Sequence, residues 1–429
     1  MKTKQKSKKP ETTLPIAVIG GGPAGMIAAQ TAVKKYKNVI LYDKNPIPGK
    51  KLGSVRYRPI YVSEKLSPEE TAKAFGEKKD FILPALKSYG WEKISEQLRK
   101  IGFTLGLNGD RRLLIPSDES PEFSVRLRDA AETAGVTIKK SSKVSDIVIS
   151  RGKVKGVVVN GVTHPVSAVI VASGSFSSPK LGSTRDGYVM AEKAGHKVVP
   201  IQPAMVGFET VEKFGKILST ILIKDCQMDI YQNDELRISD RGDIFFTKHG
   251  VEGDLMFNHT AELNDLLKKT PLKVHLDLTP DLTKHDIERI MGQELESKDR
   301  STVWEILTRY VPDRMLDVMH RMIRVHCRKP AVTLSNLERK LIAVWLKDFV
   351  FSIRRPLPFS ETKGVTGGVS VQDIDPKTMR SNKIKNLYFA GEVLDLLGPW
   401  GGYNIEMAFS TGHLAGLSAA KGNGQEKSK

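Results

Sequence analysis

The hydrophobic residues of this chain gather in short runs that end in glycine or other small residues. The runs IAVI at 16–19 and NVILYD at 38–43 flank an alanine-rich segment at 26–34. Two further runs, AVIV at 168–171 and LYFA at 387–390, also lead into glycine. Wholly apolar runs of this length are typical of parallel strands buried on both faces, and alanine favours helix. The pattern predicts an α/β domain whose strands come from both ends of the chain.

The segments between these runs predict helices and a separate inserted domain. After the helix-start signal Ser67-Pro68-Glu69-Glu70, residues up to 102 place apolar positions three and four apart, which predicts helix. Residues 124–161 predict a helix and two strands, and from about 205 strand patterns alternate before helical ones follow. We therefore expect a first sheet part over 14–205, an insertion over 206–355, a second sheet part over 356–420, and polar tails over 1–13 and 421–429.

Composition adds little to this picture, and charge adds an open question. With 429 residues and 40% hydrophobic content, the chain can bury a large core. The net charge of +18 raises the possibility of a nucleic-acid partner, but the tails carry about six of these charges and the rest are spread out. Two basic clusters remain, at residues 50, 51, 56 and 58 and at residues 321, 324, 328 and 329. Each is either a solvated face or a site for an acidic substrate or cofactor phosphate.

Several function classes are disfavoured by what the sequence lacks. No apolar run approaches the roughly 18 residues that span a bilayer, and the first apolar segment is too short for a signal peptide. Cys226 and Cys327 are far apart, which disfavours a dithiol centre and fits a cytoplasmic protein. His249, His320 and His326 have no metal-ligand spacing, so we expect no metal.

The first glycine-rich turn predicts a dinucleotide site. Gly20, Gly22 and Gly25 follow the first strand as G-x-G-x-x-G, with Pro23 and Ala24 opening the helix. The first glycine makes the turn, the second admits a pyrophosphate to the backbone, and the third allows close helix–strand packing. Asp43 ends the second strand where a carboxylate can hold ribose hydroxyls, and Lys44 follows it. No second such motif follows a strand, so two Rossmann domains are disfavoured. We expect FAD, with NAD(P)H bound, if at all, without a Rossmann domain of its own.

Further positions are expected along the same cofactor. Val144 is expected beside the adenine, and Ser173 and Gly174 end a buried strand where only small residues let the backbone approach the cofactor. Gly391 and Glu392 follow the last strand and can pass the pyrophosphate and ribityl chain. A second glycine turn then opens the final helix, and its N–H groups are expected at the N1 and O2 edge of the flavin, where reduction adds negative charge. The residues expected in that turn are Gly402, Tyr403, Asn404 and Ile405.

Four motifs resemble the BaiN-type, or aminoacetone-oxidase-like, family of FAD-dependent oxidoreductases. They are LGSTRDGY at 181–188, GDIFFTKHG at 242–250, VHLDLTPDL at 274–282 and the long stretch 365–416. The resemblance covers about 14–420. It implies a Rossmann-like FAD-binding domain with an inserted β-barrel and helical domain, in which the cofactor supplies hydride chemistry and NAD(P)H or oxygen is the redox partner.

One segment departs from the family pattern. The chain keeps Gly49-Lys50-Lys51-Leu52 but then runs GSVRYRP in place of a glycine-rich loop, so no specific substrate carries over. Lys51 is retained as a cofactor contact, and the basic loop favours a small anionic substrate. The catalytic candidates are Tyr403, His249 and Arg354 with its neighbour Arg355. Two alternatives stay open: a flavin-binding protein without turnover, motivated by the altered loop, and a tRNA-modifying flavoprotein, motivated by the charge.

Overall fold

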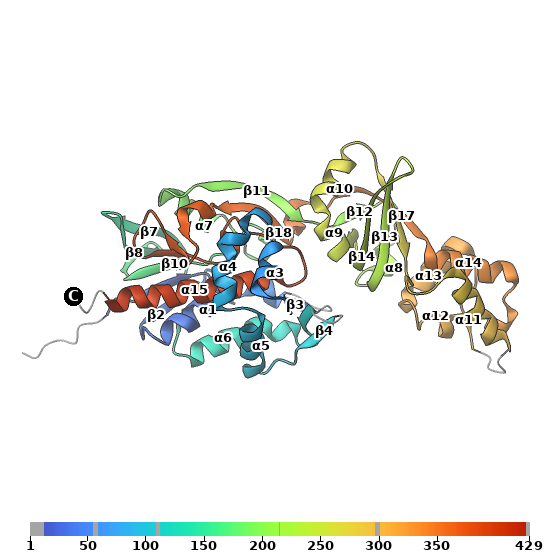
Figure 1. Cartoon of the computed structure of the whole chain (residues 1–429), viewed down its shortest axis with the longest axis horizontal. Helices are drawn as coiled ribbons and strands as arrows, with labels where there is room; N and C mark the ends of the chain where they lie inside the picture. The colour runs from blue at the N-terminus through green and yellow to red at the C-terminus, as the bar shows by residue number, and fades with distance from the viewer. Residues whose placement is uncertain (1–12, 55–58, 109–111, 214, 297–300, 426–429) are drawn as a thin grey trace, which may run out of the picture. The chain divides into compact units, whose positions relative to one another are not determined.

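The computed structural model describes residues 13–54, 59–108, 112–213, 215–296 and 301–425. They form two compact units, which are described separately (Figure 1). The first unit combines both ends of the chain, up to residue 202 and from residue 364. The second comprises Pro203–Lys363. The insertion thus interrupts one sheet domain, whose strands come from both flanking segments.

The first unit is built on a seven-stranded sheet. Its strand order is β19-β20-β21-β10-β1-β2-β6, in which the neighbours from β21 to β6 run parallel and β20 pairs antiparallel on both sides. Every residue of β1 and β10 is buried, as the wholly apolar runs predicted. The strands are β1 (Ile16–Ile19), β2 (Val39–Tyr42), β6 (Thr137–Lys139), β10 (Ala168–Val171), β19 (Ile374–Asp375), β20 (Arg380–Ser381) and β21 (Leu387–Phe389).

Two helices, α1 (Pro23–Val33) and α15 (Tyr403–Gln425), pack side by side in this unit (Figure 1). A Cβ added at Gly412 would lie 2.4 Å from the carbonyl oxygen of Ala24, and one at Gly416 would lie 2.2 Å from that of Ala28. Only glycine lets the two backbones approach so closely. Because residue numbers rise together along both helices, α1 and α15 run parallel, and their N-termini point the same way.

The other elements of the first unit surround this pair. The stretch predicted as helix after Ser67 is three helices, interrupted at Gly76 and Gly90, and Ser67 and Glu70 form the expected reciprocal cap. Two small antiparallel sheets have the orders β3-β5-β4 and β7-β8-β9, and β11 pairs with β18. The bounds are α2 (Lys50–Gly53), β3 (Ile60–Glu64), α3 (Pro68–Lys73), α4 (Lys79–Ser88), α5 (Trp91–Lys100), β4 (Gly106–Asn108), β5 (Arg112–Ile115), α6 (Phe123–Thr133), β7 (Val144–Ser150), β8 (Lys153–Val159), β9 (Val162–Pro165), α7 (Asp186–Lys193), β11 (Val198–Met205) and β18 (Gly364–Val369).

The second unit is a closed barrel with helices, as the family resemblance implied. Its strand order is β12-β15-β14-β13-β16-β17, and alternate residues of β13 face a core that contains Phe246, Phe349 and Phe351. The bounds are β12 (Phe208–Thr210), α8 (Gly215–Leu218), β13 (Leu222–Gln232), β14 (Glu235–Phe246), β15 (Gly250–Glu252), α9 (Asp254–Asn258), α10 (Thr260–Leu267), β16 (Leu272–Asp277), α11 (Lys284–Glu296), α12 (Val303–Leu307), α13 (Asp313–Ile323), α14 (Asn336–Lys347) and β17 (Phe349–Pro356).

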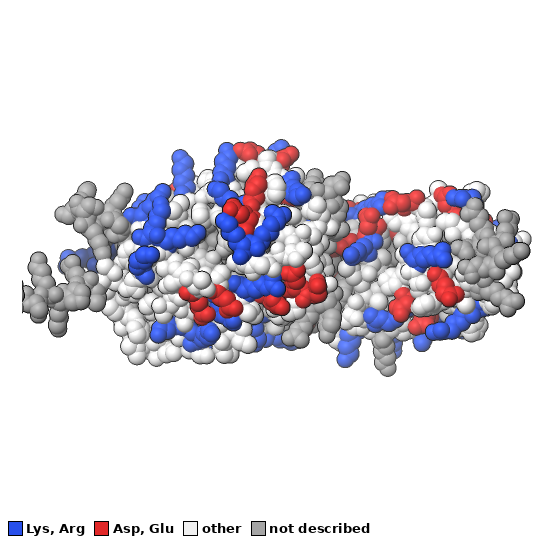
Figure 2. Space-filling view, turned by 90° about the horizontal axis from the view of Figure 1, so that it is seen from below, with Lys and Arg blue, Asp and Glu red and all other residues white. Residues whose placement is uncertain are grey.

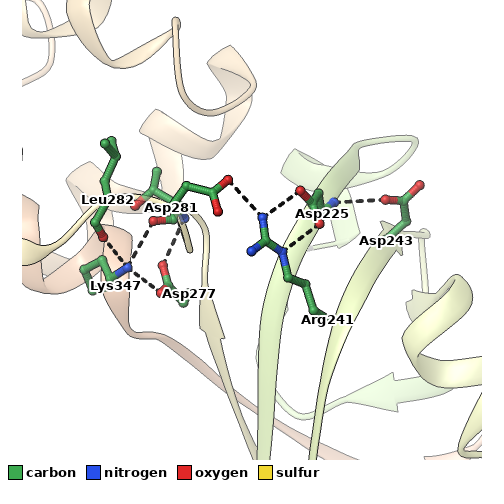
Figure 3. Close-up of polar contacts among 8 residues, drawn as sticks. Asp225, Arg241, Asp243, Asp277, Asp281, Leu282 and Lys347 are labelled. Carbon is green, nitrogen blue, oxygen red and sulfur yellow. Dashed lines mark hydrogen bonds and ion pairs between the residues drawn. The ribbon is translucent and has the colours of Figure 1, made fainter. Parts of the chain in front are cut away.

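Ion pairs connect the barrel strands of this unit to its helical part (Figure 3). Arg241 on β14 pairs with Asp225 on β13 at 2.8 Å and with Asp281, beyond the end of β16, at 2.9 Å. Lys347 at the end of α14 pairs with Asp277 at 2.5 Å and donates to the carbonyl oxygen of Thr279 at 3.0 Å. Arg241 and Lys347 therefore both reach the segment that follows β16, which fixes that segment between the barrel and α14.

The close approach of α1 and α15 predicts a strong effect of one added methyl group. Gly416→Ala must displace the Ala28 carbonyl or separate the helices, so we expect the free energy of unfolding to fall by about 1–3 kcal/mol. Thermal unfolding followed by circular dichroism measures this change. The matched control is Gly422→Ala on the same helix, whose Cβ would meet only the Tyr388 hydroxyl at 3.2 Å. The control should change the free energy of unfolding by less than about 1 kcal/mol in either direction, because the added methyl group meets one side-chain oxygen instead of a helix backbone. Equal melting temperatures for the two variants would contradict the close packing.

Candidate functional site

The three glycines of the first turn have different surroundings. A Cβ at Gly20 would lie 2.4 Å from the carbonyl oxygen of Ala172, and one at Gly25 would lie 1.9 Å from that of Gly20. These two glycines are required by packing. A Cβ at Gly22 would meet no described atom within 4 Å, and the φ of Gly22, −79°, suits any residue. Gly22 therefore faces open space at the start of α1, where N–H groups have no acceptor within the helix.

Asp43 closes this turn from the neighbouring strand. Its side chain accepts hydrogen bonds from the N–H groups of Gly21 and Asn45, both at 2.7 Å. Burial raises the pKa of the Asp43 carboxyl, while these two hydrogen bonds and the charge of Lys44 act in the opposite direction. Lys44 itself contacts the Thr184 hydroxyl and pairs with Asp186 at 3.7 Å. The acid predicted to hold a ribose thus lies at the turn, fixed by its backbone.

A second group of predicted residues surrounds the ends of β10 and β21. Lys51 donates to the Ser177 hydroxyl at 2.8 Å and pairs with Glu392 at 3.0 Å, and Glu392 also accepts from Ser175 at 3.0 Å. Glu392 belongs to a short 3-10 helix, Gly391–Val393, that directly follows β21. Lys51, which follows β2 in the chain, is thereby joined to segments that follow two other strands.

Ser173 and Gly174, which follow β10, have different surroundings. The hydroxyl of Ser173 is buried and has no hydrogen-bond partner among the residues that the structure describes. Gly174 has a φ of +74°, and a Cβ there would again meet nothing described within 4 Å. The Ser173 hydroxyl is packed against Gly187, where an added Cβ would lie 1.9 Å from it, whereas the open side-chain position at Gly174 lets a ligand approach the backbone.

The second glycine turn leads into α15. Gly401 and Gly402 have φ values of +120° and +114°, and a Cβ at Gly402 would lie 2.6 Å from the backbone nitrogen of Ser63. The Asn404 side chain accepts from the N–H of Gly398 at 2.8 Å and donates to its carbonyl oxygen at 2.9 Å. The Asn404 side chain therefore stabilises the loop that precedes α15. Ile405 is half-buried in the first helical turn of α15.

The helix N-termini that follow the two turns point in the same direction, because α1 and α15 are parallel. Ala24, at the start of α1, lies opposite Gly412, which is well inside α15. With a rise of about 1.5 Å per residue, the N-terminus of α15 extends roughly 12 Å beyond that of α1. An elongated ligand with two anionic parts can therefore meet one helix N-terminus with each part.

A buried polar cluster, which no sequence pattern indicated, lies beside the second turn. Glu64 on β3 pairs with the Nε of Arg112 at 3.3 Å and accepts from the Tyr403 hydroxyl at 3.1 Å. The Ser63 hydroxyl donates to Glu406 at 2.7 Å. Burial raises the pKa of Glu406 to about 8, with smaller contributions from the charges of Glu92 and Glu64 in the same direction. These residues come from three distant segments, so no local spacing connects them.

The other residues predicted from the sequence do not belong to the two turns or to the Glu64 cluster. Val144 is buried at the start of β7, in the sheet of β7, β8 and β9. His249 and Arg354 belong to the second unit. His249 is exposed between β14 and β15, and Arg354 and Arg355 both pair with Glu209. The basic loop residues Arg56 and Arg58 lie outside the described residues. The roles assigned to all these residues stay predictions.

The whole chain matches a known family and several relatives. A family model described as HI0933-like protein Rossmann domain matches residues 14–418. This chain belongs to that family. Its members are flavoprotein oxidoreductases, as the motifs indicated.

Two curated relatives and one solved structure illustrate the match. The 3-dehydro-bile acid delta(4,6)-reductase of Clostridium scindens is 26% identical over 95% of this chain and 99% of its own length. The ribosomal RNA dihydrouridine synthase of Haemophilus influenzae is 27% identical over 94% and 98%. A mutant form of E. coli quinol fumarate reductase FrdA has a TM-score of 0.55 at 16% identity, covering 96% of this chain and 71% of that one. The structural likeness shows a shared fold.

Two further observations concern membrane-spanning helices and metal sites in the described parts of the chain. None of the helices there combines the length and the apolar character needed to cross a membrane. No set of three or more His, Cys, Asp and Glu side chains there is arranged to hold a metal ion. The first turn and the segment after β10 fit a nucleotide, because the side-chain positions of Gly22 and Gly174 are open.

The burial of Glu406 predicts a pH-dependent stability. Its pKa rises from 4.5 to about 8 on folding, so the folded protein holds a proton that the unfolded chain releases above pH 4.5. Stability is therefore greatest below pH 4.5 for this group and falls as pH rises to about 8, by roughly 3 kcal/mol at pH 7. Glu406→Gln should remove this loss, so its melting temperature should exceed that of the wild type increasingly between pH 5 and 8.5.

The control for this experiment is Glu96→Gln. Glu96 is exposed and pairs with Lys100 on α5, and such surface pairs contribute little to stability. Its difference from the wild type should stay nearly constant with pH. A difference between Glu406→Gln and wild type that is equally constant would mean that Glu406 is ionised in the folded protein.

Proposed function

We propose that this protein is an FAD-dependent oxidoreductase that transfers hydride between its bound flavin and a conjugated carbon–carbon double bond of a small, anionic substrate. The observation that carries the proposal is the pair of parallel helix N-termini, offset along one direction, in a chain that matches a flavoprotein family almost from end to end. The type of bond follows from the two relatives. One is named as a reductase of Δ4,6 double bonds, and the other forms dihydrouridine, in which a ring double bond is reduced.

The residues of the first unit would hold the cofactor as follows. The N-terminus of α1 and the open side of Gly22 receive the pyrophosphate, and Asp43 accepts hydrogen bonds from the ribose. Ser173 and Glu392 would contact further parts of the cofactor. The N-terminus of α15 would stabilise the negative charge that the flavin edge gains on reduction. The bound flavin supplies the hydride chemistry.

Tyr403 is the proton carrier in this proposal. Its hydroxyl is held by Glu64, which the adjacent Arg112 keeps in place as an ion pair. Adding hydrogen across a double bond requires one hydride and one proton, so the substrate carbon that does not receive hydride takes the proton of the Tyr403 hydroxyl. Solvent then returns a proton to the Tyr403 phenolate. Water can approach near Arg112, whose side chain is 26% exposed.

The anionic substrate is inferred from the basic loop after Gly49. Lys51 pairs with Glu392, and from the sequence alone Lys50, Arg56 and Arg58 are the cations proposed to meet a substrate carboxylate. NADH or NADPH is the proposed reductant.

A second candidate substrate is a base in RNA. The net charge of +18 and the relative that modifies ribosomal RNA favour it. On the face seen in Figure 2, however, basic and acidic side chains are interspersed, so the charge is not gathered into one patch there.

The cofactor prediction is tested with Gly22. Purified protein should release intact FAD on acid precipitation, and recovery of FMN, NAD or no cofactor would refute the proposal. Gly22→Val should weaken FAD binding by at least about a hundredfold, since a side chain there blocks backbone donors whose charge-assisted hydrogen bonds contribute about 1.5–3 kcal/mol each. Because nothing described lies within 4 Å of the new Cβ, the melting temperature of the apoprotein should not change. Gly25→Ala, which clashes with Gly20, should instead unfold the protein at lower temperature.

The reaction is tested by stopped-flow absorbance. NADH or NADPH should bleach the bound flavin, and an α,β-unsaturated carboxylate should restore its colour faster than the matching neutral amide does. Replacing both Arg56 and Arg58 by Ala should raise KM for the carboxylate about tenfold while leaving that for the amide unchanged.

Other outcomes of this experiment favour the alternatives. A flavin that no nicotinamide nucleotide bleaches would indicate a protein without turnover. Recolouring by uridine-containing RNA alone, with affinity that falls steeply with salt, would favour the second candidate.

A further inference from the structure

Arg112 occupies the space that Gly401 leaves open at the second turn. An ideal Cβ on Gly401 would lie 3.2 Å from the Cζ and Nε of Arg112 and 3.3 Å from its Nη2. The guanidinium therefore lies directly against the backbone from which α15 begins. A side chain at position 401 would push this cation away from the helix N-terminus.

Two neighbours fix the guanidinium in this place. Its Nε pairs with Glu64 at 3.3 Å, and its Cζ lies 5.2 Å from the centre of the Tyr61 ring. The Arg112 side chain is 26% exposed and the Glu64 side chain 5%. Charges that are partly removed from water act on their surroundings more strongly than charges at an open surface.

Arg112 and Glu64 form the ion pair of this cluster. Glu406 lies within the same group, 1% exposed, and its burial holds it as a neutral acid at neutral pH. Glu92 on α5 is the other acid that acts on Glu406. Arg112 and Glu64 are thus the pair whose separate removal would change the local charge in opposite directions.

We propose that Arg112 is an electrostatic tuning residue, whose guanidinium stabilises the negative charge that the flavin gains on reduction, and that Glu64 both positions Arg112 and limits its effect. The inference rests on the proposed function, because it assumes that the flavin ring lies at the N-terminus of α15. It adds a fixed charge to the helix N-terminus at that edge, and preorganised charges of this kind act without reorganisation when the reaction occurs.

The test measures the midpoint potential of the holoprotein with a reference dye, together with the dissociation constant of oxidised FAD. Arg112→Gln should reduce the preference for reduced over oxidised FAD about tenfold, which lowers the two-electron potential by about 30 mV. Arg112→Lys should recover part of this loss. Glu64→Gln should shift the potential upward, because it removes a negative charge that lies 3.3 Å from the guanidinium. Binding of oxidised FAD should change little in all three variants.

The matched control is Arg126→Gln. Arg126 has the same side-chain exposure, 26%, pairs with Glu119 at 3.2 Å and lies over the ring of Phe103. Its loss should affect stability as much as the loss of Arg112 and leave the potential unchanged.

The outcomes separate this inference from the proposed function. If wild-type protein binds FAD that can be reduced, but Arg112→Gln and Glu64→Gln shift the potential in the same direction or not at all, the inference is wrong and the proposed function stands. A shift with Arg126→Gln as large as that with Arg112→Gln would also overturn it. If the wild-type protein binds no FAD, both fail.

Discussion

The contact between α1 and α15 is the constraint on which the candidate site depends. Gly412 and Gly416 let α15 touch the backbone of α1 at Ala24 and Ala28, and this contact fixes the two helices parallel and at a defined offset. One N-terminus follows β1, the central strand of the parallel sheet, and the other follows the glycine turn at 401–402. A ligand that reaches both must be long, and negative charge at either end of it would be stabilised. The same contact explains why the last segment of the chain belongs to the first domain.

The second turn differs from the first in what surrounds it. At Gly22 the side-chain position is open, so the glycine is needed only when a ligand approaches. At Gly401 and Gly402 the corresponding positions are filled by Arg112 and by the backbone of Ser63. Gly401 and Gly402 are therefore required by the packing of the protein itself, whether or not a ligand is bound. A proline at position 402, where φ is +114°, would break this turn, so an effect of that substitution on the flavin could not be separated from damage to the fold.

The sequence was sufficient to predict the sheet domain, because its strands are wholly apolar and its turns carry glycines at fixed spacing. The IAVI and AVIV runs became adjacent parallel strands, and the barrel agreed with what the family resemblance implied. The cluster of Glu64, Arg112 and Glu406 could not be predicted in this way. Each residue lies in a segment whose local pattern only indicates strand or helix, and their meeting depends on how β3, β5 and α15 pack. Lys51 illustrates a partial success, since it was expected at the cofactor but its ion pair with Glu392 was not foreseen.

The ion pairs of the first unit limit how much the net charge of +18 contributes to the electric field at the site. Three cations near the predicted cofactor have acidic partners: Lys44 with Asp186, Lys51 with Glu392, and Arg112 with Glu64. Each pair reduces the field that its cation exerts at a distance, while leaving the cation able to act on a group in direct contact. The excess positive charge of the chain must therefore lie mainly elsewhere, on exposed side chains that water and salt screen. The site is thus suited to act on the charge of a bound group at short range, and the overall charge is a poor guide to the substrate.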